Sequence, residues 1–582
     1  MKVKYLFFAG LVSMMAWSCS DDELQGGGND KPTDAKTYME ISINMPAATR
    51  TATPNQGQEE GQEFENYVGS VLILAVEAEE KDGKLIEDNL VFAKKVEYDG
   101  INTPATSDVS HVLINDVTGM DVKRTGVDGD TKGYTIYAFV NPTNNMVEYY
   151  TQLVGTTTAW ATAKEYRMGL QSEKENVNKF IEELTADGYA DHFNNSSQVS
   201  LNQGHFLMTD TRMENVGTGA EEQPKEKVIY YFTPGMLPGS HVLKASTNVE
   251  RAVARFDYKD NGTYTLADNA NSTEQPDGGA ELTIKLTDYC VMNVAKDFYY
   301  LKRVTENADR GSAANWIYGG AELNTNDVKN YVVDADWDSK KNWNWTVEGG
   351  NVVANDLFYT PLNGNTTDNY ISLSKTLFED NDQGDYKALC YCTENTIFGV
   401  DNQIHGLTTA IVFKAEVTGD FVKDAPDEEG KKALYRYSNT IYNSWDAVKK
   451  VASLGTGVAD YDDYYKAFRD DNKDLYKKPD ITKWDIKGGD ADAKATCYYT
   501  YWNRHNDNGN NTEMGIMEFA VVRNNIYKLF VKKILRLGDP EDPTNPEHPI
   551  EPGEKDESEK ISMEVDVKVL NWAVRQNDIT FD

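Results

Sequence analysis

The residue with the most clearly defined chemistry is a cysteine close to the amino terminus. Lys2 and Lys4 precede a short apolar run, YLFFAGLVSMMAW, and Cys19 follows Ser18 directly after that run. A basic start, an apolar run too short for a permanent transmembrane helix and a small residue before cysteine are typical of a bacterial lipoprotein signal. The alternative is an ordinary signal peptide with a chance cysteine. Because the chain has only 5 cysteines, we predict a signal peptide over residues 1–18, lipidation of the Cys19 thiol with palmitate, and a precursor anchored in the outer membrane.

A second position suited to chemistry is the peptide bond after Arg50, where a protease could act. Arg50 is the first arginine of the chain and lies in residues 47–63, which are rich in Thr, Gln, Gly and Glu. Exposed segments of this composition are preferred sites of proteolysis. Taken alone, a loop arginine more often has no such role. An Arg-specific protease acting here would cut between Arg50 and Thr51 and would make residues 19–50 a propeptide.

Composition and motifs narrow the possible function classes. The 582 residues include 58 Lys and Arg against 94 Asp and Glu, which gives a formal net charge of −36. This acidity excludes nucleic acid as a partner, because binding to phosphate backbones needs a basic surface. The chain has no HExxH, Walker, GxSxG or CxxC motif, and its 7 histidines have no metal-like spacing. We therefore expect no enzyme activity, no metal and no cofactor.

Two features of the sequence stay open. Cysteines other than Cys19 could form disulfides in an oxidising compartment, or they could lie buried as free thiols that behave like small apolar side chains. These cysteines are Cys290, Cys390, Cys392 and Cys497. The acidic segment 461–480 matches no motif, and we assign it no function.

Two segments at opposite ends of the chain alternate between apolar and polar residues, as half-buried strands do. In Thr37–Met45 the residues on the apolar face are Met39, Ile41, Ile43 and Met45. Near the carboxy terminus the apolar residues are Ile561, Met563, Val565, Val567 and Val569, followed by Trp572. Prolines spaced by three between Asp539 and Gly553 precede this second segment, and they indicate an extended polyproline II spacer. A lone strand held away from its domain is unstable, so we expect it to pair with a sheet edge of another molecule.

Between these segments, short apolar runs alternate with long polar connections. Strands are predicted at Ser70–Val76, Thr135–Val140, Ala410–Val417 and Met514–Val522, and a helix at Asn443–Leu454. This spacing favours sandwiches over a parallel α/β fold. We expect a mainly β protein with two β-sandwich domains and a few helical insertions. The expected parts are an N-terminal domain over 51–245, a C-terminal domain over 246–537, the spacer over 538–560 and a detached donor strand over 561–582.

Several blocks of the sequence resemble a known family. Ala520–Gly538 reads AVVRNNIYKLFVKKILRLG and is followed by the spacer and by a terminal strand that ends SMEVDVKVLNWAV. This region resembles the C-terminal region of the Mfa-type major fimbrillins, the stalk subunits of type V fimbriae. Less specific similarities to that family are found in Gly204–Asp210, Val249–Arg255 and Tyr391–Phe413.

The resemblance implies two transthyretin-like β-sandwiches and the function of a surface fimbria (pilus) subunit that supports adhesion. It also implies that an Arg-specific protease removes the lipidated amino terminus with its first strand. The C-terminal strand of another subunit then fills the vacated place, which is donor-strand exchange. The implied partners are further copies of the chain, accessory fimbrial subunits and the protease, together with a host or microbial ligand that the sequence does not identify. The alternatives are an anchor or tip subunit, or a surface glycan-binding lipoprotein, although a monomeric binding module has no use for a detached strand.

Overall fold

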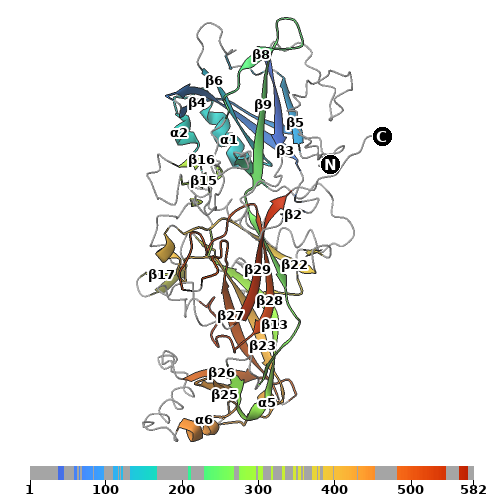
Figure 1. Ribbon diagram of the computed structural model, residues 1–582, viewed down its shortest axis with the longest axis vertical. Helices are drawn as coiled ribbons and strands as arrows, with labels where there is room; N and C mark the ends of the chain where they lie inside the picture. Colours follow the sequence, from blue (N-terminus) through green and yellow to red (C-terminus); the bar gives the residue numbers. More distant parts are fainter. Residues whose placement is uncertain are drawn as a thin grey trace, which may run out of the picture.

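The computed structural model of the protein is built mainly of β-sheets. Figure 1 shows two β-rich regions arranged end to end along the long axis, with few and short helices. The mainly β fold predicted from the sequence is therefore confirmed. The residues that the structure describes are 37–44, 58–61, 65, 68–82, 84–97, 109–115, 117, 120–121, 132–166, 207–211, 228–267, 274–295, 299–305, 316–318, 331–334, 345–348, 351–354, 358–359, 370–375, 378–380, 385–397, 399–428, 430–452, 481–489, 491–510, 512–545 and 563–573.

The first β-rich region contains one 8-stranded sheet. Its strand order is β4-β3-β6-β7-β9-β1-β5, and β8 pairs with β9 beside this path. Helices α1 (Asn144–Leu153) and α2 (Trp160–Ala163) lie against the sheet. The strands are β1 (Thr37–Asn44), β3 (Ser70–Lys81), β4 (Lys84–Glu97), β5 (Val109–Asn115), β6 (Lys132–Val140), β7 (Met208–Thr211), β8 (Phe232–Pro234) and β9 (His241–Arg251).

Strand β3 is apolar throughout its first half because both faces of the sheet are covered there. Leu72 and Leu74 pack in a cluster that includes Trp160 of α2. Val71 and Ile73, which alternate with them, pack in a second cluster with residues of β1. A strand buried on both faces carries a continuous apolar run, which explains why this strand is recognisable in the sequence.

The second β-rich region is a sandwich of two sheets around one core. Phe256 and Tyr527 from one sheet share this core with Phe413 and Trp484 from the other. The first sheet has the order β2 (Gln58–Glu60), β29 (Met563–Ala573), β28 (Asn525–Ile534), β10 (Ala254–Lys259), β22 (Tyr386–Cys392) and β21 (Phe378–Asp380). The second has the order β11 (Tyr264–Ala267), β13 (Glu281–Met292), β23 (Ala410–Thr418), β27 (Lys494–Trp502), β26 (Ile481–Lys487), β24 (Lys432–Tyr437), β25 (Thr440–Tyr442) and β12 (Gln275–Pro276), with β20 (Ile371–Ser372) beside β13.

Three two-stranded sheets lie outside the large sheets. They pair β14 (Val294–Ala295) with β19 (Phe358–Tyr359), β15 (Arg303–Val304) with β16 (Ile317–Tyr318), and β17 (Trp345–Glu348) with β18 (Asn351–Ala354). Figure 1 shows β15 and β16 beside the helices of the first region, where Tyr318 packs in the same cluster as Trp160. The short 3-10 helices are η2 (Asp277–Gly279) and η4 (Val400–Asn402).

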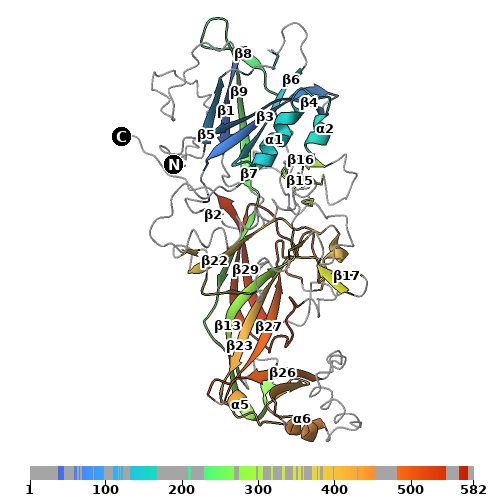
Figure 2. The same cartoon turned by 180° about the vertical axis from the view of Figure 1, so that it is seen from behind.

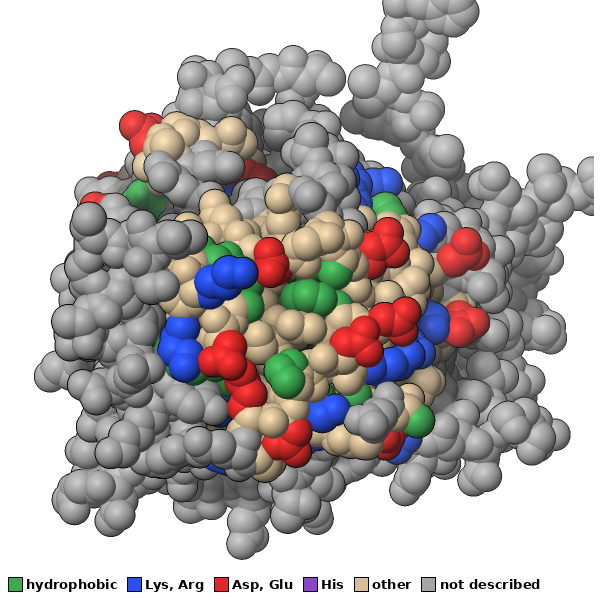
Figure 3. Space-filling view, turned by 90° about the horizontal axis from the view of Figure 1, so that it is seen from below, with side chains coloured by type: hydrophobic (Ala, Val, Ile, Leu, Met, Phe, Trp, Pro, Cys, Tyr) green, Lys and Arg blue, Asp and Glu red, His purple; other side chains and the backbone are tan. Residues whose placement is uncertain are grey.

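The far end of the second region carries α5 (Asp420–Lys423) and α6 (Trp445–Ala452). Helix α6 confirms the helix predicted at Asn443–Leu454. Figure 3 views this end and shows acidic and basic side chains interspersed, with hydrophobic side chains in small separate spots. On α6, for example, Lys449 Nζ lies 3.0 Å from Asp446 Oδ1. Such a surface is well solvated, and its exposed ion pairs contribute little to stability.

Two predicted boundaries differ from the structure. The expected domain boundary between residues 245 and 246 falls inside β9, which continues to Arg251 before the chain enters the other region at β10. The alternation of Val249–Tyr258 reads as one strand because both halves are buried, although the chain changes sheets at residues 252–253. Met514–Val522, predicted as a strand, is irregular up to a bridge at Val521, and the following strand β28 begins at Asn525.

The terminal strand is not detached, which corrects the prediction for residues 561–582. Strand β29 pairs antiparallel with β28 of its own chain from Met563 opposite Ile534 to Asn571 opposite Asn525. The physical reason is that an alternating apolar face gains stability from any suitable sheet edge, and β28 offers one nearby. The proline-rich spacer therefore does not keep the strand away from its own sandwich.

Candidate assembly site

The amino-terminal strand β1 is an interior strand of its sheet. It pairs antiparallel with β5 and parallel with β9, and Figure 2 shows it between these two strands. Met39, Ile41 and Ile43 are at most 1% exposed and pack in the same cluster as Leu243 of β9. Removal of β1 would therefore uncover an apolar core together with the backbone hydrogen-bonding groups of both neighbours. The fourth predicted residue of this face, Met45, lies outside the described residues.

Polar contacts hold β1 in one register. Glu40 and Lys244 are Cα partners across β1 and β9, and Lys244 Nζ lies 2.6 Å from Glu40 Oε2. The N–H of Met236, in the turn between β8 and β9, donates a hydrogen bond of 3.5 Å to the hydroxyl oxygen of Tyr38. The side chains of Lys244 and Glu40 are 63% and 34% exposed. Their pair therefore adds little energy, but it distinguishes an acidic partner from a basic one.

Strand β29 presents its apolar face to the core of the second region. Met563 is buried in that core, and Val565 and Val567 pack against it half-buried. On the opposite face, Lys533 Nζ lies 3.0 Å from Glu564 Oε2. A second ion pair joins Lys532 and Asp566. The alternating apolar face predicted for this segment is therefore buried, but it packs against the second region of the same chain.

The other predicted site residues can be placed only in part. Val569 and Trp572 belong to β29, but their side chains lie outside the description. Cys19, Arg50, Thr51 and Ile561 lie wholly outside the described residues. The acidic segment 461–480 also lies outside them.

A short strand after the predicted cleavage position was missed by the sequence analysis, which expected residues 47–63 to be loose. Strand β2 (Gln58–Glu60) pairs parallel with Asn571–Ala573 of β29. Glu59 is 3% exposed and forms ion pairs with Arg255 and Lys528. Burial away from water raises the pKa of Glu59 to about 7, although both cations oppose the shift. The segment is therefore anchored in the second region through a buried carboxyl group.

A second buried acid strengthens this anchor. Glu65 Oε2 accepts a hydrogen bond of 3.1 Å from Arg255 Nη1, and the hydroxyl of Tyr391 donates one of 2.6 Å to Glu65 Oε1. Arg255 Nε also donates to Asp257 Oδ1 at 2.8 Å. A buried guanidinium needs acidic partners, so the inward-facing arginines of Val249–Arg255 were the available sequence signal for this cluster.

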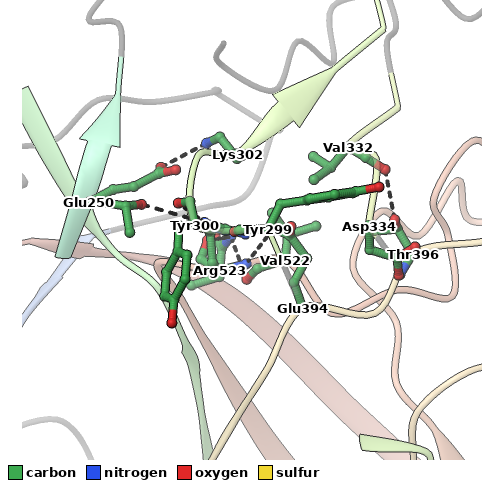
Figure 4. Close-up of polar contacts among 12 residues, drawn as sticks. Glu250, Tyr299, Tyr300, Lys302, Val332, Asp334, Glu394, Thr396, Val522 and Arg523 are labelled. Atoms are coloured by element: carbon green, nitrogen blue, oxygen red, sulfur yellow. Dashed lines mark hydrogen bonds and ion pairs between the residues drawn. The ribbon is translucent and has the colours of Figure 1, made fainter. Parts of the chain in front are cut away.

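Residues of the family-like blocks meet in a buried polar network between the two regions, which Figure 4 shows in close-up. Arg523 precedes β28, and its Nη2 lies 3.0 Å from Glu394 Oε1. The same guanidinium donates hydrogen bonds of 2.8 and 3.1 Å to the carbonyl oxygens of Tyr299 and Tyr300. Nearby, Lys302 Nζ lies 2.7 Å from Glu250 Oε2 at the end of β9. The network therefore ties the end of the first sheet to the loops of the second region.

Neighbouring residues of the same blocks complete this polar framework. The side-chain amide of Asn395 donates to the carbonyl oxygens of Asn293 and Leu407 at 3.0 and 3.1 Å. Gln403 Oε1 accepts a hydrogen bond of 2.6 Å from the N–H of Phe519. These side chains satisfy buried backbone groups of irregular loops, which is a structural role rather than a chemical one.

The cysteines that the structure describes are free and buried, which settles the choice left open for Cys290, Cys390, Cys392 and Cys497. Burial raises the pKa of the Cys497 thiol to about 12. A thiol protonated at neutral pH is a poor nucleophile and a poor metal ligand. In the described ranges, no group of three or more His, Cys, Asp or Glu residues is arranged to hold a metal ion. Within the same ranges, no helix is long and apolar enough to span a bilayer.

Comparisons with known proteins give one family match and several structural likenesses. Residues 493–578 match the family described as "Major fimbrial subunit protein type IV, Fimbrillin, C-terminal". No curated protein sequence matches the chain.

Three similar solved structures illustrate the likenesses. A putative cell adhesion protein from Parabacteroides distasonis is 13% identical with a TM-score of 0.36, and the alignment covers 93% of this chain and 98% of that one. A fimbrilin (FimA) from Porphyromonas gingivalis is 10% identical with a TM-score of 0.31, covering 93% and 99%. The tip fimbrial protein Mfa3 from the same organism is 11% identical with a TM-score of 0.29, covering 92% and 99%.

At these identities and TM-scores, the assignment of a family rests on residues 493–578. The matched segment includes β28, β29 and the Val-Val-Arg-Asn-Asn-Ile-Tyr block from which the resemblance was drawn. The match supports the role of a fimbrial subunit for the chain. The resemblance to the fimbrillins is thus confirmed for residues 493–578, which match the fimbrillin family.

Proposed function

We propose that this protein is a structural subunit of a cell-surface fimbria that is assembled by donor-strand exchange. In this scheme the chain is exported as a lipoprotein acylated at Cys19 and is cut after Arg50. Loss of β1 then opens a place in the first sheet, which β29 of another copy fills. Such a subunit acts by binding further subunits, and its adhesion ligand is a separate question.

The observation that carries the proposal is the position of Arg50 between two docked strands of different regions. Strand β1 ends at Asn44 in the first sheet, and β2 begins at Gln58 in the second region. A cut at Arg50 would leave β1 held by non-covalent contacts alone. The new amino terminus at Thr51 would stay tied to the second region through Glu59. Cleavage would therefore release one strand without loosening the domain that follows.

The contacts of β1 also explain why an uncut chain would not polymerise. Burial of three large apolar side chains is worth about 1.5–3 kcal/mol each, and β1 pairs along most of its length on both sides. An incoming strand cannot compete with a segment that is covalently attached and already in place. Removing the covalent link turns the strand into a ligand that can be lost and replaced.

The donor step can be tested with substitutions on the two faces of β29. Val565→Lys together with Val567→Lys places charges on the apolar face, and an unpaired charge buried in the acceptor sheet is strongly unfavourable. The matched control is Asp566→Ser with Lys568→Ser, because both side chains are exposed in the same strand. We expect fimbriae in the control and none in the lysine variant, as seen by electron microscopy of sheared surface material.

Folding of the variants needs its own measurement, since Val565 and Val567 also pack against the home sandwich. Thermal unfolding of the purified monomers should show that both β-rich regions remain folded in each variant. A chain lacking residues 561–582 provides the second test. Normal fimbriae from that truncated chain would exclude donation by the carboxy-terminal strand and would favour packing of subunits through their surfaces.

A further inference from the structure

Strands β1 and β29 share more than an alternating pattern. Residues Tyr38–Met45 read YMEISINM, and Ser562–Val569 read SMEVDVKV. In both segments a methionine is followed by a glutamate and then by two β-branched residues at alternate positions. Aligned in the same direction, Met563 corresponds to Met39 and Glu564 to Glu40.

We propose that the donor strand occupies the acceptor sheet in this one register, parallel to β9 and antiparallel to β5, with Glu564 facing Lys244 of the receiving copy. This inference rests on the proposed donor-strand exchange and adds the direction, register and recognition pair of the joint. The occupant is a second copy of this chain.

The apolar face fits in this register. Met563 replaces Met39 without a change of side chain, and Val565 and Val567 replace Ile41 and Ile43. Each isoleucine-to-valine change removes one methyl group from a site that is at most 1% exposed. Deletions of this size are among the mildest that a packed core experiences. The core that receives Met39, Ile41 and Ile43 can therefore accept the donor without rearrangement.

The charged face selects the direction. Glu40 lies opposite Lys244 in the precursor at 2.6 Å, and Glu564 restores an acid at that position. If the strand ran the opposite way with Val569 at the position of Met39, Lys568 would lie opposite Lys244. Like charges directly across a ladder are unfavourable. Sequence direction and charge thus agree on the parallel arrangement.

The remaining registers lose either the charge match or the shape match. A shift of two residues that brings Ile561 to the position of Met39 leaves uncharged Ser562 opposite Lys244. A reversed strand with Asp566 opposite Lys244 keeps an acid there. That arrangement forces Met563 into the site of Ile43 and puts the smaller Val567 at the site of Met39. Overpacking at one site and a void at the other are both destabilising.

The acid also changes partners during the exchange. While β29 is paired with β28 of its own chain, Glu564 Oε2 lies 3.0 Å from Lys533 Nζ. Transfer to another copy moves the same carboxylate from Lys533 to Lys244, where Glu40 has been lost with the cleaved segment. Both states of the strand thus pair Glu564 with a lysine, so the recognition group is not left unpaired in either state.

Cysteine cross-linking tests the register directly. Asn248 of β9 is the Cα partner of Asn44, so Asn248→Cys reports which donor residue takes the place of Asn44 and leaves Lys244 intact. The donor cysteines, introduced one at a time, are Ser562→Cys, Glu564→Cys, Asp566→Cys, Lys568→Cys and Leu570→Cys. Partners on neighbouring strands are within the span of a disulfide. The native cysteines that the structure describes are buried and do not compete.

We expect the Lys568→Cys donor to give intermolecular dimers with Asn248→Cys when intact fimbriae are oxidised and analysed on non-reducing gels. A parallel strand shifted by two residues in either direction would cross-link through Asp566→Cys or Leu570→Cys instead. A strand running the opposite way, in either of the two registers described above, would cross-link through Glu564→Cys or Ser562→Cys. Any of these four outcomes overturns the register while leaving strand donation in place. Fimbriae in which none of the five donors cross-links would also overturn the register, and the chain lacking residues 561–582 then decides whether strand donation itself is wrong.

A charge exchange tests the recognition pair. Glu564→Lys should lower incorporation into fimbriae by about two- to five-fold, as expected for a partly exposed ion pair. Combining it with Lys244→Glu, Glu40→Lys and Lys533→Glu should restore incorporation, because the pairs of Glu564 with Lys533 and with Lys244, and the pair of Glu40 with Lys244, are then all reversed. Asp566→Lys is the matched control on the same face. An equal loss in that control, or no recovery in the combined variant, would mean that the Glu564–Lys244 pair does not select the register.

Discussion

Arg523 and Glu394 form an ion pair in which Nη2 lies 3.0 Å from Oε1 and neither side chain is more than 1% exposed. Arg523 Nη1 also lies 3.4 Å from the hydroxyl oxygen of Thr209 on β7, so one guanidinium contacts residues of both regions. The guanidinium of Arg523 therefore ties the first sheet to the second region.

Arg523→Ala should lower the free energy of unfolding by about 3–5 kcal/mol, because it leaves the Glu394 carboxylate buried without its cation. Chemical denaturation of the purified monomer measures the loss. Lys423→Ala removes a cation from an exposed pair with Asp420 and should cost less than about 1 kcal/mol. If Arg523→Met combined with Glu394→Met costs as much as Arg523→Ala, the unpaired carboxylate is not the cause of the loss.

The buried Glu59 predicts a pH dependence of stability. Its pKa rises from 4.5 to about 7 on folding, so folding favours the protonated form. The associated stability is fully present below about pH 4.5 and is lost as the pH rises towards 7, and it amounts to roughly 3 kcal/mol. Glu59→Gln, which stays neutral, should lack this fall in the free energy of unfolding. Glu564→Gln, at a side chain 40% exposed, is the control and should follow the wild type.

Cleavage after Arg50 predicts the amino terminus of the assembled subunit. Subunits purified from fimbriae should begin at Thr51, as Edman sequencing or mass spectrometry would show. Arg50→Gln should retain β1 and prevent assembly, whereas Arg124→Gln, at the next arginine along the chain, should assemble normally. Fimbriae whose subunits still begin at Cys19 would remove proteolysis from the mechanism.

Lipidation of Cys19 predicts the incorporation of labelled palmitate into the precursor. Cys19→Ala should abolish the label and impair surface display, because the thiol is the acylated group. Ser18→Ala keeps a small residue before the cysteine and is expected to leave labelling unchanged. Labelling that persists in Cys19→Ala would show that this cysteine is not the modified residue.

The sequence predicted the elements whose side-chain pattern is set by burial. The continuous apolar run of β3 and the alternation of Met39, Ile41 and Ile43 identify strands because the sheet is covered where these side chains pack. Strand β2 carries the polar sequence QEE and gives no such signal. Its position depends on the ion pairs of Glu59 with Arg255 and Lys528, which are far away in the sequence and meet only in the fold.

The sequence also could not predict which sheet the terminal strand joins. The alternation of Met563, Val565 and Val567 specifies an apolar face but not the sheet that covers it. Both the home edge at β28 and the vacated place of β1 satisfy the same pattern. A proline-rich spacer limits local conformation, but it does not decide between two destinations of similar chemistry.

The docking of β29 against β28 has a kinetic consequence. A donor that must leave its own sheet before it can enter another is available only for the fraction of time that it spends undocked. Elongation would then follow subunit concentration only when subunits are scarce. Where the donor is β29 of the subunit at the growing end, elongation would approach a ceiling equal to the rate at which that strand opens once free subunits are abundant. Growth of cleaved subunits from preformed fimbrial ends should therefore level off at a rate that rises when the ion pairs of Lys532 and Lys533 are removed.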